Sequence, residues 1–147
     1  WSGDWSSDVC SSDLSNDIQP AFYFDKNSNI IEYVYFNYNS ANINQLGCRQ
    51  LSNLATFLQE NSIVTIAITC SYDSSDETEY NKMLSKRRAN NVRLYLLGKG
   101  IVGERVRINA LVDVKSNQSN EVYHYNQEIL EKQRRAELEI SWSKKWN

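Results

Sequence analysis

The chain has 147 residues, of which 41% are hydrophobic and 23% are charged, and its formal net charge at pH 7 is −2. This length and composition are typical of one globular domain with a hydrophobic core. A charge so close to zero gives no sign of the basic surface that binds nucleic acid, so we expect no nucleic-acid partner. The single histidine, His124, and the absence of any zinc-type cysteine spacing give no indication of a metal or another cofactor.

Residues 1–14 are set apart from the rest because their sequence resembles the translation of a common sequencing adapter. They contain no apolar run and hence neither a signal peptide nor a membrane-spanning helix. We expect the natural N-terminus to be missing, together with any targeting signal or anchor. Without this segment the chain has 16 bases and 15 acids, a net charge of +1. Two cysteines remain, Cys48 and Cys70, and they are either buried apolar side chains or a disulfide pair.

The first third of the remaining chain predicts one strand and one helix. Residues 15–29 are polar with an aromatic patch, which favours a linker or an edge strand. Residues 30–38 are rich in β-branched and aromatic side chains and predict a strand. Residues 44–60 predict a helix because apolar residues recur at helical spacing, with Asn42 or Asn44 as its N-cap.

The rest of the chain alternates in the same way. Residues 63–69 predict a strand with apolar side chains on both faces. Residues 78–97 predict a second helix, which begins with an acidic version of the capping box formed by Asp76 and Glu79. A strand follows at residues 104–114, and a helical pattern follows at residues 121–132. The last strand is predicted at Arg135 to Trp142. Its inward residues are Ala136, Leu138, Ile140 and Trp142, and those of the preceding strand are Val106, Ile108, Ala110 and Val112.

The predicted order is therefore β-α-β-α-β-(α)-β. Strands that alternate with helices predict an α/β (α+β) sandwich, with helices on one face of a partly parallel, four-stranded sheet. The last strand follows without a long helix, so we expect one antiparallel pairing, which makes the sheet mixed. The domain is expected to span residues 30–142, with residues 143–147 as a C-terminal tail.

A charged residue interrupts an apolar face of the second helix. Leu84, Arg88 and Val92 are spaced i, i+4 and i+8, so they share that face. An arginine in an apolar stripe is costly unless a negative group meets it or its tip reaches water. The nearest acid is Asp73, in the polar loop before the helix. Three interpretations of Arg88 follow. It forms an ion pair with Asp73 that holds the loop to the helix, its guanidinium extends to water, or it belongs to a binding site.

The same stretch resembles the OmpA-like C-terminal domain, the peptidoglycan-anchoring module of bacterial envelopes. That family has a T-D-x-x-G loop followed by N-x-x-L-S-x-x-R-A-x-x-V on a helix. The residues in this register are Asp73, Asn81, Leu84, Ser85, Arg88, Ala89 and Val92. Phe36 to Ala41 is similar to the family's first-strand segment, F-x-F-[DN]-x-[SA]. Gln133 to Ile140 is similar to its closing N-R-R-V-E-I strand. The three matches occur in the family's order and cover residues 30–142.

The resemblance implies a ligand and a site. The ligand of the family is the diaminopimelate side chain of the peptidoglycan stem peptide, whose end carries an ammonium and a carboxylate. Asp73 would bind the ammonium and Arg88 the carboxylate, which suits the planar fork of arginine. The other implied ligand-binding residues are Asn37, Asn39, Asn81, Ser85 and Arg135. For Asn81 and Ser85 the alternative is local capping and packing, and for Arg134 and Arg135 it is a solvated strand face.

Three positions depart from the family pattern. Cys70 replaces the residues that usually precede T-D, Tyr72 stands at the threonine position, and Asp76 stands at the loop glycine. A tyrosine is bulkier beside a pocket, and a residue with a Cβ tolerates positive φ less well than glycine. These changes reshape or close the implied site.

The sequence supports two non-enzymatic functions better than an enzymatic one. The first is binding of the peptidoglycan stem peptide, which anchors an outer-membrane or envelope protein to the cell wall at the periplasmic face of the outer membrane. Contact with the membrane is then made only by the missing N-terminal part. The alternative is a structural or interaction module of an envelope or surface-appendage assembly, with envelope proteins as partners. A cell-wall hydrolase that uses Asp73 with Glu77 or Glu79 is disfavoured, because helix capping already accounts for the acids.

Overall fold

The computed structural model describes residues 30–74, 77–114 and 131–142. The elements, in chain order, are β1 (Ile30–Tyr35), α1 (Gln45–Glu60), β2 (Thr65–Tyr72), α2 (Thr78–Gly98), the 3₁₀ turn η3 (Gly103–Arg105), β3 (Val106–Asp113) and β4 (Arg135–Ser141). They confirm the predicted alternation of strands and helices. The predictions for residues 1–29 and 143–147, and for most of the helix at residues 121–132, lie outside the described residues.

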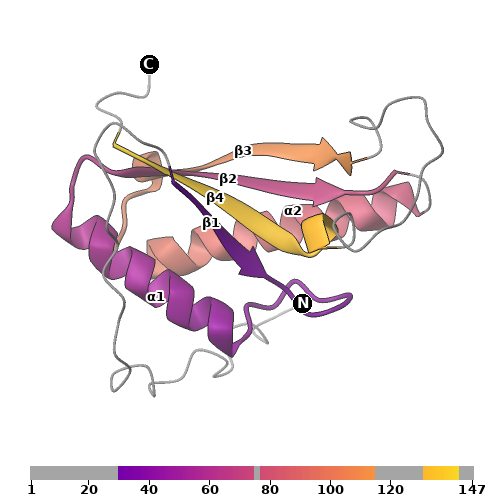
Figure 1. Cartoon of the computed structure of the whole chain (residues 1–147), viewed down its shortest axis with the longest axis horizontal. Coiled ribbons are helices and arrows are strands. Elements are labelled where there is room, and N and C mark those ends of the chain that lie inside the picture. The colour runs from indigo at the N-terminus through magenta and orange to yellow at the C-terminus, as the bar shows by residue number, and fades with distance from the viewer. Residues whose placement is uncertain (1–29, 75–76, 115–130, 143–147) are drawn as a thin grey trace.

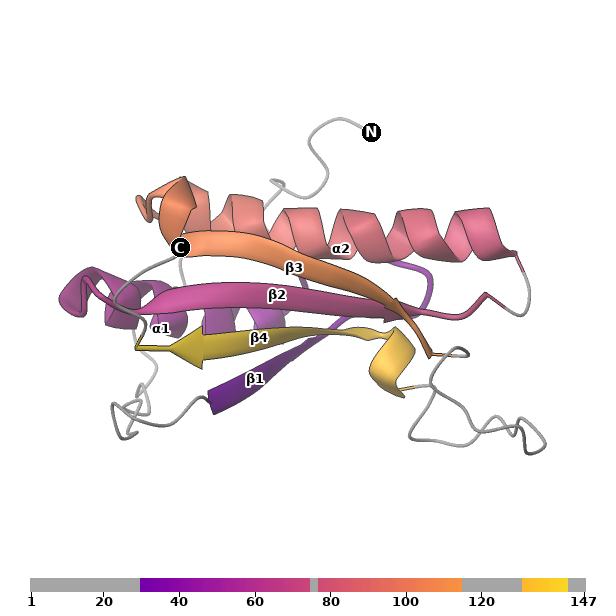
Figure 2. The same ribbon diagram turned by 90° about the horizontal axis from the view of Figure 1, so that it is seen from above.

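The sheet is mixed, as expected, with the strand order β1-β4-β2-β3. β2 and β3 are parallel, whereas β4 runs antiparallel to both of its neighbours, which is one antiparallel pairing more than the sequence suggested. The last strand of the chain therefore lies inside the sheet (Figure 1). Both helices lie on the same side of the sheet (Figure 2), and α2 contacts β2, β3 and β4. Among the described residues, neither helix combines the length and apolar character that a membrane crossing requires.

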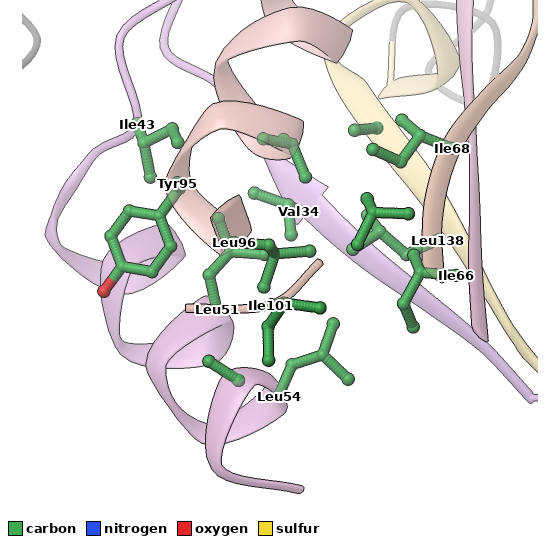
Figure 3. Close-up of a cluster of buried hydrophobic side chains, with 14 of the residues drawn as sticks. Val34, Ile43, Leu51, Leu54, Ile66, Ile68, Tyr95, Leu96, Ile101 and Leu138 are labelled. Atoms are coloured by element: carbon green, nitrogen blue, oxygen red, sulfur yellow. The ribbon is translucent and has the colours of Figure 1, made fainter. Parts of the chain in front are cut away.

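The hydrophobic core fills the space between the sheet and the helices. Every second residue of β4 points into it, and Ala136, Leu138 and Ile140 are fully buried as predicted. Figure 3 shows Leu51 and Leu54 of α1 meeting the strand residues across this layer. Each such side chain contributes roughly 1.5–3 kcal/mol by leaving water. This core fixes the positions of the strand ends, where the polar residues lie.

The inward row of β3 differs from the prediction after Ile108. The register with β2 shifts at this point, because Ile68 lies opposite Ile108 whereas Thr69 lies opposite Ala110. The extra residue turns the following side chains over. Leu111 therefore packs against the core, and the prediction that Ala110 and Val112 point inward is wrong. A bulge of this kind leaves no mark in a pattern of alternating apolar residues.

Cys70 is a free, buried thiol, so the disulfide with Cys48 that the sequence left open is not formed. Burial raises the pKa of the Cys70 thiol to about 12, against the lowering effect of the nearby Arg88 charge. Cys70 therefore serves as a small apolar side chain of the core, which was the other alternative.

Candidate functional site

A pocket of about 1000 Å³ opens at the edge of the sheet where β1 and β2 end and β4 begins. Its walls come from the loop after β1, the end of β2, the first turns of α2 and the residues just before β4. The lining residues are Tyr38, Asn39, Ser71, Tyr72, Asp73, Glu77, Thr78, Glu79, Tyr80, Asn81, Leu84, Ser85, Arg88, Gln133 and Arg134. Five of the residues implied by the resemblance are among them.

Strand direction explains why residues so distant in sequence meet here. β1 and β2 both run antiparallel to β4, so their carboxyl ends emerge at the same edge of the sheet as the amino end of β4 (Figure 1). Asp73 directly follows β2, Arg134 directly precedes β4, and Asn39 lies in the loop after β1, and this brings the three residues to one pocket. Helix α2 starts beside the same edge and supplies the remaining wall.

Arg88 is the central cation of the site and is only 3% exposed. Its guanidinium donates to three main-chain carbonyls: Nε to Ser40 at 2.8 Å, one terminal nitrogen to Gln133 at 2.6 Å and the other to Asn37 at 3.2 Å. It also lies over the ring of Phe36, 5.3 Å from its centroid. Among the described residues, Arg88 forms no ion pair, so the tie between loop and helix is made through carbonyls and not through Asp73.

Arg88 is unusual because its guanidinium carries a full charge although it is buried. Burial lowers the pKa of its guanidinium to about 10, with the Arg134 charge acting in the same direction and the Cys70 and Tyr80 side chains opposing it. Arg88 is thus protonated at pH 7. Carbonyl dipoles, rather than a carboxylate, balance its charge within the described residues, and a carboxylate-bearing ligand would complete that balance.

The other polar residues of the helix motif hold the loops around the pocket. The amide of Asn81 donates to the carbonyl of Asp73 at 3.0 Å, and the buried hydroxyl of Ser85 donates to the carbonyl of Ser71 at 2.7 Å. Asn91, one turn further along, donates to the carbonyl of Ala41 at 2.7 Å. These bonds are the contacts that the capping and packing alternative requires. They fix the loop after β1 and the end of β2 against one face of α2.

Asp73 lies at the end of β2, only 2% exposed, in the wall of the pocket. Asn39 also lies in the wall, and its left-handed backbone, with φ of 56°, suits asparagine. Asn37 is exposed and lies outside the lining residues; its carbonyl accepts from Arg88 and its side chain accepts from Asn44. Asn44, not Asn42, is the N-cap of α1.

Arg135 lies away from the pocket, on the sheet face opposite the helices. Its guanidinium pairs with Glu137 at 2.9 Å and lies 4.0 Å from the ring centroid of Tyr33. The neighbouring Arg134 lines the pocket instead. Successive side chains near a strand alternate in direction, so only one of the two arginines can face the pocket. The sequence did not indicate which one.

The start of α2 differs from the predicted capping box. Its N-cap residue is Glu77 rather than Asp76, with a left-handed backbone at φ of 46° and no side-chain cap. Asp76 lies outside the described residues. Glu77 lines the pocket, as do Tyr38, Tyr80 and Gln133, which the sequence reasoning did not assign to the site. Tyr80 could have been found, since it lies two turns before Arg88 on the same face.

Tyr72, the bulky residue at the threonine position, stands in the wall and leaves the pocket open beside it. Three acids (Asp73, Glu77 and Glu79) and two arginines (Arg88 and Arg134) line the same space. The pocket therefore offers both signs of charge. Within the described ranges, no cluster of histidine, cysteine or acidic side chains could hold a metal ion.

The mixed sheet and the two helices behind it define a small domain of the α/β sandwich class, with a polar pocket at the end of its sheet. Residues 35–134 match the OmpA family, and the chain belongs to this family. The resemblance carried by three separate segments of the sequence is thereby confirmed.

Similar proteins agree with this assignment. The peptidoglycan-associated lipoprotein of Buchnera aphidicola subsp. Baizongia pistaciae is 33% identical over 95 residues, which cover 65% of this chain and 52% of that protein. The chain thus spans about half the length of that relative. The crystal structure of the peptidoglycan-associated lipoprotein from Burkholderia pseudomallei gives a TM-score of 0.59 at 24% identity, covering 74% of this chain and 89% of that one. The periplasmic domain of Helicobacter pylori MotB gives 0.57 at 18% identity, covering 78% and 77%. Both solved structures share the fold.

Proposed function

We propose that this domain binds peptidoglycan without catalysis, through the diaminopimelate end of the stem peptide. The observation that carries the proposal is the pocket of about 1000 Å³ whose wall contains both a buried carboxylate, Asp73, and a buried guanidinium, Arg88, that has no ion pair among the described residues. A ligand that ends in an ammonium and a carboxylate presents a charge opposite to that of each of these two side chains. The name of one relative, peptidoglycan-associated lipoprotein, supports peptidoglycan as the polymer that is bound.

The hydrogen bonds of Arg88 define how it would take part. A guanidinium has five N–H donors, and three of them are directed to main-chain carbonyls. The remaining two are available for a ligand carboxylate, so Arg88 both holds the pocket together and completes it. A charged hydrogen bond of this kind contributes roughly 1.5–3 kcal/mol. Asp73, almost fully removed from water, would receive the ammonium.

The proposed role is anchoring rather than hydrolysis. Asp73 is buried, but Glu77 and Glu79 are exposed at the start of α2. Cleavage of a glycosidic bond needs an acid held protonated by its surroundings, opposite a second carboxylate, and an exposed glutamate is poorly suited to that role. We place the protein on the periplasmic side of the envelope, at the outer membrane, where a domain that grips the wall would anchor the rest of its protein.

A second role is favoured by the sheet face opposite the helices. Ile31, Tyr33 and Tyr35 of β1 are exposed there, at 49%, 37% and 39%. The Arg135 guanidinium lies over the ring of Tyr33 and is paired with Glu137, so charged groups border this apolar row. A row of exposed apolar residues is a candidate surface for an envelope protein partner. This interaction role is compatible with wall binding, because the two surfaces are separate.

The decisive experiment is a calorimetric titration of the chain with meso-diaminopimelate, beside Asp73→Asn and Glu79→Gln. Both substitutions remove one negative charge from the pocket wall, but only Asp73 is buried there. We expect saturable binding to the parent and to Glu79→Gln, and at least tenfold weaker binding to a folded Asp73→Asn. A folded parent that binds neither diaminopimelate nor a stem peptide would refute the proposal and leave the interaction role.

A further inference from the structure

A second, smaller pocket adjoins the first. It has a volume of about 180 Å³ and lies between the loop after β1 and the outer side of α2. Asn39, Tyr80 and Leu84 line both pockets. The two spaces are therefore neighbours along one groove, with a common wall, rather than separate features of the surface.

A single hydrogen bond lies in that common wall. The hydroxyl of Tyr80, on α2, donates to the side-chain oxygen of Asn39, in the loop after β1. Both residues are exposed, Tyr80 by 46%. Breaking a hydrogen bond between exposed partners costs little free energy, because water replaces it readily. The bond therefore separates the two pockets only weakly. The backbone around it is firm, since Arg88 and Asn91 hold the carbonyls of Ser40 and Ala41. Opening the bond requires only that the two side chains move.

The chemistry of the small pocket is cationic. Its remaining residues are Ser40, Ala41, Asn42, Met83 and Arg87. Among the described residues that line this pocket, Arg87 is the one with a charge. It is exposed, and among the described residues its guanidinium forms no ion pair or hydrogen bond. A volume of 180 Å³ holds about six water molecules at roughly 30 Å³ each, enough for a carboxylate and the carbon atoms next to it.

We infer that the small pocket is a second anion subsite of the same binding groove, in which Arg87 binds a carboxylate that precedes diaminopimelate in the stem peptide, and that the Tyr80–Asn39 hydrogen bond must open to admit it. The inference rests on the proposed function, because it extends the ligand of the main pocket. In a stem peptide of the form L-Ala-γ-D-Glu-meso-diaminopimelate, the γ-linked D-glutamate carries a free α-carboxylate one residue from the diaminopimelate end. Planar bidentate recognition of this carboxylate suits the free guanidinium.

The test uses two peptides that differ only in this carboxylate: the tripeptide acid, and its analogue in which the α-carboxyl of D-glutamate is an amide. Parent, Arg87→Gln and Lys86→Gln are titrated with each. Lys86 is the matched control, because it is exposed, adjacent on α2 and lines neither pocket. We expect the parent and Lys86→Gln to prefer the acid by roughly tenfold, the value of one charged hydrogen bond near 1.4 kcal/mol. Arg87→Gln should bind both peptides equally.

The role of the Tyr80–Asn39 hydrogen bond is tested by Tyr80→Phe, which keeps the ring and removes the hydroxyl. We expect the tripeptide acid to bind this variant a few-fold more tightly than the parent, since no hydrogen bond has to open. Equal affinity of the parent for acid and amide, or an acid preference that persists in Arg87→Gln, would overturn the subsite while the main pocket stands. A folded parent that binds neither peptide would overturn the proposed function and the subsite together.

Discussion

Replacing Arg88 by lysine separates the structural role of this residue from its role toward a ligand. The guanidinium joins three carbonyls of two segments, those of Asn37 and Ser40 in the loop after β1 and that of Gln133 before β4, over distances of 2.6–3.2 Å. A lysine keeps the charge, but its single ammonium at the end of a flexible stem cannot reproduce a planar fork that reaches in three directions. We expect at least two of the three bonds to be lost from a site that is 3% exposed.

The magnitude follows from those bonds. Each hydrogen bond to a charged group is worth roughly 1.5–3 kcal/mol, so the loss of two predicts a decrease of about 3–6 kcal/mol in the free energy of unfolding. That is a large part of the roughly 5–15 kcal/mol that stabilises a typical domain. Urea unfolding without ligand measures it, and the control is Arg87→Lys, one residue earlier and exposed, for which we expect a change within about 0.5 kcal/mol. If the free energy of unfolding of Arg88→Lys lay within about 1 kcal/mol of the parent value, the reasoning that the three carbonyl hydrogen bonds of Arg88 stabilise the domain would be refuted.

Three further predictions concern stability. Leu138→Ala should lower the free energy of unfolding by about 2–5 kcal/mol in urea, because this fully buried side chain lies in a strand with neighbours on both sides; a loss below about 1 kcal/mol would contradict the packing. Ser85→Ala should cost about 1–3 kcal/mol, since it removes the donor to the buried carbonyl of Ser71, whereas Ser62→Ala, at an exposed position, serves as a control with little expected effect. Because the pKa of Cys70 rises from 9.0 to about 12, the folded state retains a proton that the unfolded chain releases above pH 9, so stability falls as the pH rises through this range. Between pH 9 and 10 the parent should lose up to about 1.4 kcal/mol relative to Cys70→Ala, and parallel pH profiles for the two would argue against it.

The departures from the family pattern now have structural meaning. Tyr72 was expected to reshape or close the site, and it forms part of the wall of a pocket that remains open. Among the described residues of the loop between β2 and α2, Glu77 has a positive φ, of 46°. A non-glycine residue in that conformation costs roughly 1–2 kcal/mol, which the surrounding contacts must offset. Backbone strain of this kind is concentrated at binding sites, and here it borders the pocket.

The sequence by itself determined the elements and their order. Apolar residues at a spacing of 3.6 or 2 define α1, α2 and β4 because such a pattern can be buried in only one way along each element. The N-cap of α1 was narrowed to Asn42 or Asn44, and the end of α2 was predicted one residue before Gly98, because both depend on local backbone chemistry. Asp73 and Arg88 could be assigned to one site because they lie on consecutive elements and match the register of a known family.

Only the tertiary structure decided what these residues contact. The three carbonyls bound by Arg88 lie 45–51 residues away in sequence, and main-chain carbonyls carry no sequence signal. The insertion of β4 between β1 and β2 placed Arg134 in the wall of the pocket and Arg135 outside it. The bulge in β3 turned Leu111 into the core in place of Ala110 and Val112. Sequence patterns fix which face of an element is apolar, whereas the partners of a polar side chain depend on which strands become neighbours, and that is settled by packing across the whole domain.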